Sequence, residues 1–304
     1  MVDEPGTGGL GVSVVVPTIG RPLLLTRCLQ SILACDPPAG EVIVVDQSAG
    51  DEVGRCVEAL GATTARVVAC PARGIARATN LGFASARHGM VLVTHDDCTV
   101  APDWVAVAHR LLLRHPYAML TGRVLPPDGS GYVPSTIVSE EPHDYTGSVT
   151  SGVLYPANMA VDRNALLAFG GFDERRGLEL AAEDNDLCFR WLCAGRALRF
   201  EPELVVWHHD WRSPAELLRT HITYAHGQGA FYAKHLRAGE RRILPLLRWD
   251  LSHGIDAVAV GVLKRRPRWQ DPYREMVVAL LWGIAANLPE ANRLARQGPR
   301  QPDD

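Results

Sequence analysis

The sequence predicts an α/β fold, in which a mostly parallel sheet with flanking helices is followed by a helical C-terminal extension. Strand and helix patterns alternate along the first 115 residues. Hydrophobic residues make up 47% of the 304 residues and charged residues 21%, which is enough to bury a sizeable core. From residue 237 onward the apolar segments have helical spacing. Alternating strands and helices are typical of a sheet whose parallel strands are connected by helices.

Buried strands are predicted from short apolar runs that are rich in β-branched residues and end at polar or turn residues. These runs are residues 12–16, 41–45, 65–69 and 90–94. Helices are predicted where apolar residues recur every three or four positions. The helical segments are residues 22–34, 52–60, 75–87, 104–115 and 181–194, and a further short strand is predicted at 204–206.

The composition excludes several classes of protein. The formal net charge of −3 argues against a basic protein that coats nucleic acid. The apolar runs fall short of the roughly 18 residues that span a bilayer, and the acidic, glycine-rich start lacks a signal-peptide pattern. Seven cysteines without a CxxC pair indicate neither a disulfide framework nor structural zinc, so a cytoplasmic location is expected. The GxGxxG match at residues 6–11 precedes the first strand, whereas a dinucleotide-binding loop would follow it.

Polar side chains follow three predicted strands directly, at residues 17–21, 46–51 and 95–98. Ligands of parallel α/β sheets bind beyond the carboxyl ends of the strands. We therefore expect the three segments to lie on one rim of the sheet and to form a ligand site.

The third of these segments, His95-Asp96-Asp97-Cys98, has two interpretations. Adjacent carboxylates repel each other unless a cation or hydrogen-bond donors compensate, and oxygen ligands suit Mg²⁺ or Mn²⁺. The alternative is structural, because Asp97 or Thr99 could cap the helix that starts near residues 102–104.

Three other motifs also have a chemical and a structural interpretation. Glu183-Asp-Asn-Asp186 is either an acidic helix start favoured by the helix dipole or the site of a general base, Asp184. His208, in Trp207-His-His209, is either a metal ligand or half-buried polar surface. The segment 73–80 places Arg77 near a helix start, where it either binds phosphate or is an ordinary surface arginine.

The order and spacing of these motifs resemble the family-two nucleotide-sugar glycosyltransferases, whose GT-A fold is Rossmann-like. The resemblance covers about residues 12–209. It rests on Val12-Ser-Val-Val-Val-Pro-Thr18, Val44-Val-Asp-Gln-Ser48 with Asp51, Arg73-Gly-Ile-Ala-Arg-Ala-Thr-Asn80 with Gly82, His95-Asp-Asp97 with Pro102, Asn158-Met-Ala160, Gly170-Gly-Phe-Asp-Glu174, and Glu183-Asp-Asn-Asp-Leu187 with Arg190.

The resemblance implies an inverting transfer of one sugar, of the hexosyl or deoxyhexosyl class, from a nucleoside-diphosphate sugar to an acceptor hydroxyl. It implies that Asp97 binds Mn²⁺ or Mg²⁺ and that Asp184 is the catalytic base. His95 stands where the family often has the first Asp, and Leu187 stands where processive polymerases have the Gln of QxxRW. A single-addition enzyme is therefore favoured over a polymerase. The donor-binding set it implies is Thr18, Arg21, Asp46, Gln47 and Asp96, with Arg77, and the acceptor-side set is Asn158, Asp173, Glu183 and Trp191.

The expected organisation is a catalytic domain at residues 1–236, with nucleotide-sugar binding at 12–125 and the acceptor part at 126–236. Residues 237–304 are expected to be helical, because a shift to basic charge and a local break near 236–240 mark a boundary. With the basic cluster at 264–268, this region either packs on the catalytic domain or docks on an anionic membrane surface, the inner face of the cell membrane. The acceptor is a glycan, a lipid-linked sugar or a small molecule, and nucleic acid is not an expected partner.

Two other functions remain open at this point. One is a sugar-nucleotide or glycan-binding module that has lost its activity, because His95 and Gln47 depart from the family pattern. The other is a sugar nucleotidyltransferase, which also uses a nucleotide, a metal and acids. A nucleotidyltransferase would carry a Gly-rich basic loop after the first strand, and residues 17–22 match that poorly.

Overall fold

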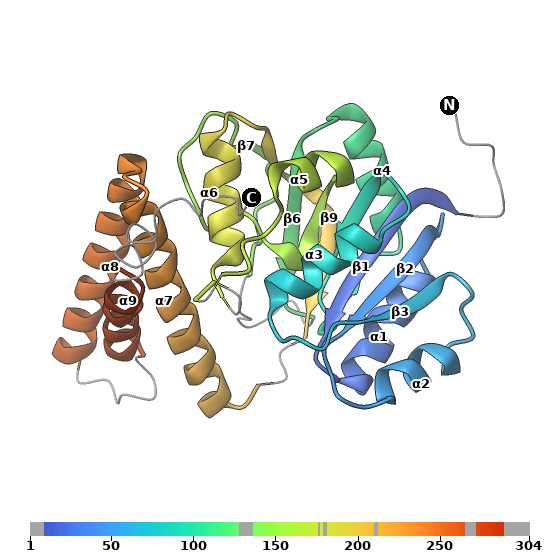
Figure 1. The fold of residues 1–304 in the computed structure, drawn as a ribbon, viewed down its shortest axis with the longest axis horizontal. Helices are drawn as coiled ribbons and strands as arrows, with labels where there is room; N and C mark the ends of the chain where they lie inside the picture. Colours follow the sequence, from blue (N-terminus) through green and yellow to red (C-terminus); the bar gives the residue numbers. More distant parts are fainter. Residues whose placement is uncertain are drawn as a thin grey trace, which may run out of the picture. The chain divides into compact units, whose positions relative to one another are not determined.

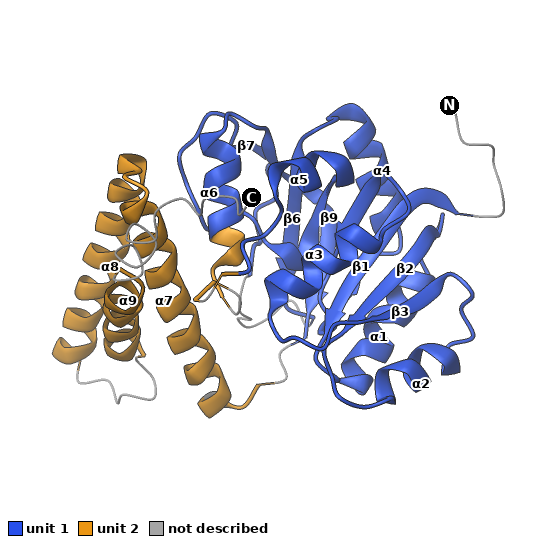
Figure 2. Cartoon of the chain, viewed as in Figure 1, with its two compact units in different colours: residues 1–174, 186–211 blue, residues 175–185, 212–304 orange. Residues whose placement is uncertain are grey.

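The computed structural model describes residues 9–127, 136–175, 177–178, 181–209, 212–264 and 272–288. The chain divides into two compact units, residues 1–174 with 186–211 and residues 175–185 with 212–304 (Figure 2). The division does not follow the predicted boundary near residues 236–240. Helix α7 (Pro214–Arg237), which the sequence reasoning missed, runs unbroken up to that point and belongs to the second unit.

The first unit is built on a mixed sheet with the strand order β3-β2-β1-β4-β8-β6-β9-β5, in which β7 also pairs with β9 (Figure 1). Pairing is parallel among β1 to β4 and between β6 and β9, whereas β8, β5 and β7 run against their neighbours. The predicted mostly parallel sheet is therefore confirmed. The strands are β1 (Leu10–Thr18), β2 (Ala39–Asp46), β3 (Ala65–Ala69), β4 (Met90–Val93), β5 (Cys98–Val100), β6 (Met119–Leu125), β7 (His143–Asp144), β8 (Met159–Asp162) and β9 (Leu198–His208).

Helices cover both faces of this sheet, which explains why its central strands are continuous apolar runs. On β1, Val14 and Val16 pack in one cluster with side chains of α1 and α4, whereas Val15 packs in another with side chains of α3. The helices and 3₁₀ turn of this unit are α1 (Pro22–Leu33), α2 (Glu52–Ala59), α3 (Ile75–Ser85), α4 (Trp104–Arg114), η1 (Pro156–Asn158) and α5 (Arg163–Phe169), and α6 (Glu183–Cys193) begins in the second unit and continues in the first.

The second unit consists mainly of α7, the 3₁₀ turn η2 (Arg241–Ile243), α8 (Leu244–Leu263) and α9 (Tyr273–Asn287). A capping box between Ser213 and Glu216 starts α7. Helices α7 and α9 pack closely because Gly229 and Gly283 lack side chains, since a Cβ on either would lie 2.2 Å from a backbone oxygen of the other helix. Among the described helices, none carries an apolar stretch sufficient to cross a bilayer.

Candidate active site

The strand ends bring the predicted polar segments together on one rim of the first unit. Thr18, the last residue of β1, pairs with Asp46, the last residue of β2. The backbone N–H of Gln47 donates to the Thr18 carbonyl oxygen at 3.0 Å. On the other side of β1, strand β4 leads directly into the loop that carries Asp96 and Asp97. The placement of these residues follows from the parallel register of β2, β1 and β4.

Asp46 and Gln47 shape one side of this rim. Oδ1 of Asp46 accepts hydrogen bonds from the backbone N–H of Ser48 at 2.8 Å and from its hydroxyl at 2.7 Å. The Gln47 amide nitrogen donates to the carbonyl oxygens of Ala72 at 2.6 Å and Gly74 at 3.1 Å. Gln47 therefore holds the loop that leads into α3, and an acid at this position could not donate those two bonds.

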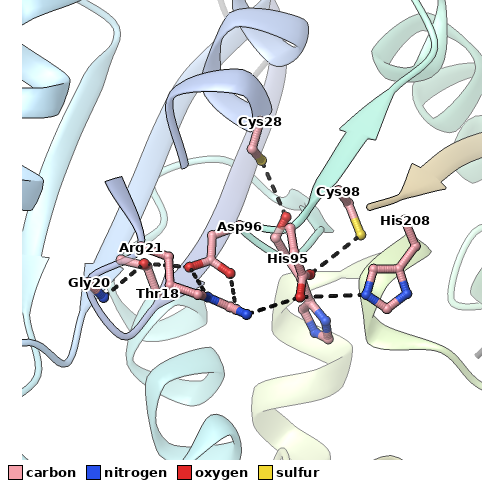
Figure 3. A network of polar contacts seen from close by, with 9 residues as sticks. Thr18, Gly20, Arg21, Cys28, His95, Asp96, Cys98 and His208 are labelled. Atoms are coloured by element: carbon pink, nitrogen blue, oxygen red, sulfur yellow. Dashed lines mark hydrogen bonds and ion pairs between the residues drawn. The ribbon is translucent and has the colours of Figure 1, made fainter. Parts of the chain in front are cut away.

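Arg21 is bound by both acids of the third segment (Figure 3). Its Nε donates to Asp96 Oδ2 and its Nη1 donates to Asp97 Oδ2, both at 3.1 Å, and its Nη2 pairs with Asp96 Oδ1. The Thr18 hydroxyl donates to Asp96 Oδ2 at 2.6 Å and accepts the Gly20 N–H at 3.3 Å. Gly20 has φ +87° and lies against the Ser48 side chain, so the turn between β1 and α1 depends on glycine. The sequence placed Arg21 on the rim, but it did not predict this double ion pair.

The two acids have opposite pKa shifts. Burial opposes the charge of Asp97, but His208, Arg21 and His95 outweigh it and hold its pKa well below the usual range. Burial raises the pKa of Asp96, and the Asp97 charge adds to this effect, although Arg21 and Thr18 oppose it. Burial also disfavours the Arg21 cation, yet Asp97 and Asp96 raise its pKa overall. Asp97 is therefore the acid that is most firmly ionised.

Strands β5 and β9 bring His208 to Asp97. Cys98 pairs with His208 in their antiparallel register, and the N–H of His209 donates to the Asp97 carbonyl oxygen at 2.8 Å. His208 Nε2 lies 3.5 Å from Asp97 Oδ2. One ligand atom each from Asp97, Cys98 and His208 lies within 4.8 Å of the others.

These donors fit Mn²⁺ through Asp97 and His208, because a carboxylate and an imidazole are usual ligands for it. The sequence had singled out both residues. Cys98 is a poor third ligand for a hard cation, since burial and the Asp97 charge keep its pKa well above the usual value and the thiol protonated.

Asp184 lies in the second unit, in the first turn of α6, and the preceding Ala182 has φ +63°. Its Oδ1 accepts the backbone N–H of Asn185 at 2.7 Å. Burial raises the pKa of Asp184 to about 6, and burial together with the Asp184 charge raises the pKa of Glu183 well above its usual value. A carboxylate with such a pKa is ionised at neutral pH and is a better proton acceptor than an exposed one.

The segment around Asp173 is tied to α3. The Asn80 amide donates to the Phe172 carbonyl oxygen at 2.9 Å and accepts the Phe172 N–H at 3.0 Å. Arg77 Nε pairs with Glu174 Oε2 at 3.2 Å in an exposed ion pair. A phosphate contact by Arg77 would therefore compete with Glu174, whereas Asp173 is half-buried in this turn.

Two predicted acceptor-side residues lie in the core. Asn158 is fully buried, with its amide oxygen accepting the Trp104 indole N–H at 2.9 Å and its nitrogen donating to the Arg123 and Leu204 carbonyl oxygens. Trp191 is also buried, and its indole donates to the Ala197 carbonyl oxygen at 2.8 Å. These bonds connect β6, β9 and α4 and fix the end of α6, so both side chains support the fold and present no surface to a sugar.

A third acid of α6, Asp186, has an ion-pair partner on the same helix. Asp186 pairs with Arg190 at 2.6 Å, four residues further along the helix, a spacing that places two side chains on the same helix face. Arg190 also donates to the Gly171 carbonyl oxygen at 2.8 Å. Asp186 therefore has a structural partner, which distinguishes it from Asp184 two residues earlier.

Comparisons with known proteins identify the family and the fold. The model of the family described as "Glycosyltransferase like family 2" matches residues 9–223. Among curated proteins none matches the sequence.

Three solved structures share the fold at low sequence identity. A mannosyltransferase from Pyrobaculum calidifontis, solved with GDP-Man and Mn²⁺, has a TM-score of 0.61 and 20% identity, covering 92% of this chain and 87% of its own. TarS of S. aureus (residues 1–349) has a TM-score of 0.54 and 17% identity over 96% and 93% of the two chains. GalNAc-T7, solved with UDP, GalNAc and Mn²⁺, has a TM-score of 0.53 and 16% identity over 84% of this chain and 58% of its own. The chain is thus a glycosyltransferase with the GT-A fold and belongs to glycosyltransferase-like family 2.

Proposed function

We propose that this enzyme transfers a single sugar from a nucleoside-diphosphate sugar to an acceptor hydroxyl, with inversion and with the help of a divalent cation. The observation that carries the proposal is the cluster at the ends of β1 and β4, where Asp97 is held ionised beside Arg21 and His208. Such a cluster is suited to a diphosphate and its cation, because Asp96, Asp97 and His208 are buried, Arg21 is half-buried, and their hydrogen bonds already orient them.

The donor is proposed to bind along the rim. Asp46 and Gln47 lie on the side of the nucleoside, while Thr18, Arg21 and Asp96 lie toward the diphosphate. Arg21 would contribute positive charge to the phosphates while remaining bound to Asp96. Arg77 would join them on release from Glu174. The Mn²⁺ complexes of two structural neighbours support the same type of donor.

Mn²⁺, or Mg²⁺ with a weaker fit, would be held by Asp97 and His208. When bound, the cation neutralises the charge that develops on the leaving diphosphate. Asp97 can serve as its ligand over a wide pH range, since its pKa is low. Arg21 neutralises the same carboxylate without the cation, so it keeps the acid pair stable between turnovers.

Asp184 is proposed to accept the proton of the acceptor hydroxyl. A hydroxyl is a poor nucleophile at neutral pH, and a positioned carboxylate with a raised pKa assists its attack. One displacement with one base inverts the anomeric configuration, so a carboxylate nucleophile of the kind used by retaining hydrolases is unnecessary. Asp173 and Glu183 are proposed to shape the acceptor side. Leu187, in place of the Gln of processive polymerases, supports single addition.

Product analysis tests this function directly. The enzyme is incubated with Mn²⁺, individual nucleotide sugars and a set of glycan, lipid-linked and small-molecule acceptors, and separately with nucleoside triphosphates and sugar 1-phosphates, and the products are identified. Release of a nucleoside diphosphate from a nucleotide sugar supports glycosyl transfer. Formation of a nucleotide sugar and pyrophosphate from a nucleoside triphosphate and a sugar 1-phosphate would instead show nucleotidyl transfer. A panel of nucleotide sugars that bind, as judged by a raised melting temperature, without any turnover would support an inactive binding module.

We further propose that the second unit docks on the cytoplasmic surface of an anionic membrane, which would suit a lipid-linked acceptor. Helix α9 exposes Val278, Leu281, Trp282 and Ala285 on one face, while its opposite face packs through Ala279, Leu280 and Gly283. Val278 is 67% exposed and Trp282 65% exposed. An apolar helix face beside basic residues is typical of attachment to the membrane surface.

The second unit also exposes basic residues. Arg248, Lys264 and Arg274 are exposed in the same unit, and residues 265–268 of the predicted basic cluster lie outside the described residues. Val278→Gln with Trp282→Gln should abolish co-sedimentation with vesicles that contain phosphatidylglycerol, and Leu113→Gln on α4 is a matched exposed control. Neutralising Arg265, Arg266 and Arg268 should also lower binding. If wild type and the α9 variant sediment equally, the docking proposal is wrong.

A further inference from the structure

A chain of hydrogen bonds within the second unit ends beside the proposed base. The Asn185 side-chain nitrogen donates to Gln228 Oε1 at 2.8 Å. The Gln228 nitrogen donates to Asp250 Oδ2 at 3.0 Å and to the Tyr232 hydroxyl at 3.1 Å, and that hydroxyl donates to the same Asp250 oxygen at 2.6 Å. The chain thus leads from the start of α6 through α7 to α8.

The chemistry of these groups fixes the direction of every bond. The Asp250 carboxylate accepts and does not donate, so the Gln228 amide nitrogen and the Tyr232 hydroxyl must be its donors. Burial, reinforced by the Asp250 charge, raises the pKa of Tyr232 and keeps its hydroxyl protonated. The Gln228 amide therefore has one orientation, in which Oε1 is directed to Asn185.

Asn185 connects this series of hydrogen bonds to Asp184. Its backbone N–H donates to Asp184 Oδ1 at 2.7 Å, while its side chain is held by Gln228. The segment before α6 also lies tightly against α7, because a Cβ on Gly227 would be 2.7 Å from the Ala181 carbonyl oxygen. Helix α7 thus sets the backbone that carries Asp184, and it does so by close packing and by a directional hydrogen bond.

We propose that Gln228 and Asp250 are positioning residues for Asp184, so that the C-terminal helices take part in catalysis by holding the base. This inference rests on the proposed role of Asp184 as the base. Neither residue needs to touch the substrate. The rate should depend on them because small errors in the position of a reacting group are costly, up to about 100-fold for about 1 Å.

The test compares variants that remove or keep the hydrogen bonds. Gln228→Leu removes all three side-chain hydrogen bonds of Gln228 at similar size. We expect kcat to fall roughly tenfold while KM for the donor changes less than about threefold. Asp250→Leu should have the same effect. Asp250→Asn keeps an oxygen acceptor and should remain within about threefold of the wild-type kcat. Thr223→Ala, on an exposed part of α7, is the matched control and should leave kcat unchanged.

A double variant separates positioning from a general structural effect. If Gln228 acts through Asp184, Gln228→Leu causes no further loss of rate in the Asp184→Asn background. Hydrogen exchange of the amides at residues 183–187 should also be faster in Gln228→Leu than in Thr223→Ala. Additive losses in the double variant, or wild-type kcat and exchange in Gln228→Leu, would overturn the positioning role while leaving Asp184 as the base. Wild-type kcat in Asp184→Asn would overturn the proposed base itself and the positioning role with it.

Discussion

Two pairs of adjacent acids, Asp96–Asp97 in the first unit and Glu183–Asp184 in the second, differ in their electrostatics although burial acts on both. Burial raises the pKa of Glu183 and Asp184. At Asp97 the neighbouring His208 and Arg21 reverse this effect and lower the pKa. The neighbours of a buried carboxylate, more than its burial, therefore decide its chemistry. One pair contains an acid that stays ionised and can hold cations, and the other contains an acid that can accept a proton near neutral pH.

The largest predicted effect is at the second pair. Asp184→Asn should lower kcat on the order of 1,000-fold, within the range for loss of a general base, and should leave nucleotide affinity within a few-fold. The amide should also raise the melting temperature at pH 7.5. Because the folded-state pKa of Asp184 is raised, its ionisation above the unfolded value opposes folding, and Asn does not ionise. Steady-state nucleotide release and thermal unfolding measure the two effects. A near-normal rate would place the base elsewhere.

Replacing Arg21, which pairs with both acids of the first pair, should mainly lower the stability of the protein. Arg21→Met leaves two buried carboxylates without the guanidinium, which should lower the free energy of unfolding by about 3 kcal/mol. Arg21→Lys keeps the charge without the forked geometry and should be intermediate. Urea unfolding measures both variants. Saturating Mn²⁺ should recover part of the loss in Arg21→Met, and equal destabilisation with and without Mn²⁺ would show that no cation replaces Arg21 there.

Nucleotide binding should distinguish Asp97, the acid of the proposed metal site, from an ordinary surface acid. Asp97→Asn should weaken nucleoside-diphosphate binding in the presence of Mn²⁺ by on the order of 100-fold, or about 2.8 kcal/mol. Asp144→Asn, which loses an exposed ion pair with Arg199 in the same unit, is the matched control and should bind normally. Calorimetry with and without Mn²⁺ measures this. If Asp97→Asn and Asp144→Asn bind the nucleoside diphosphate with the same affinity, both with and without Mn²⁺, Asp97 is excluded as a metal ligand.

The smallest predicted effect is at Cys98, which lies close to Asp97 and His208. Its thiol is held protonated by burial and by the Asp97 charge, so we expect it to pack beside the site without binding the cation. Cys98→Ser should change the Mn²⁺ dependence of nucleotide binding less than about threefold, because the hard cation gains little from a thiol. A loss comparable to that of Asp97→Asn would make Cys98 a ligand.

The rim of the sheet was predictable because its residues follow strands whose apolar runs are unmistakable. The ends of β1, β2 and β4 fall where the sequence puts them, and Asp46, Asp96 and Asp97 gather as expected. Strands β5 to β8 were missed because they are short or mixed in polarity, although β5 is what pairs Cys98 with His208. The ion pairs of Arg21 with both acids depend on the turn at Gly20. A linear sequence pattern does not reveal the conformation of that turn.

The second unit was less predictable for a different reason. Charge and a local break indicated a boundary near residues 236–240, but α7 ends there and its contacts are with α9. The Ser213–Glu216 capping box was a readable signal for its start. Nothing in the linear order of the motifs indicates that residues 175–185 belong with the C-terminal helices. Asn158 and Trp191, which the family resemblance placed on the acceptor side, are buried in the core, and a linear pattern does not reveal that burial.

The pH dependence of kcat tests the division between the two acid pairs most directly. With saturating donor, acceptor and Mn²⁺, the wild-type kcat should fall tenfold per pH unit below about 6, because Asp184 must be deprotonated to accept the proton. The residual rate of Asp184→Asn should show no such limb. A wild-type profile that stays flat down to pH 5, or the same limb in Asp184→Asn, would contradict the account.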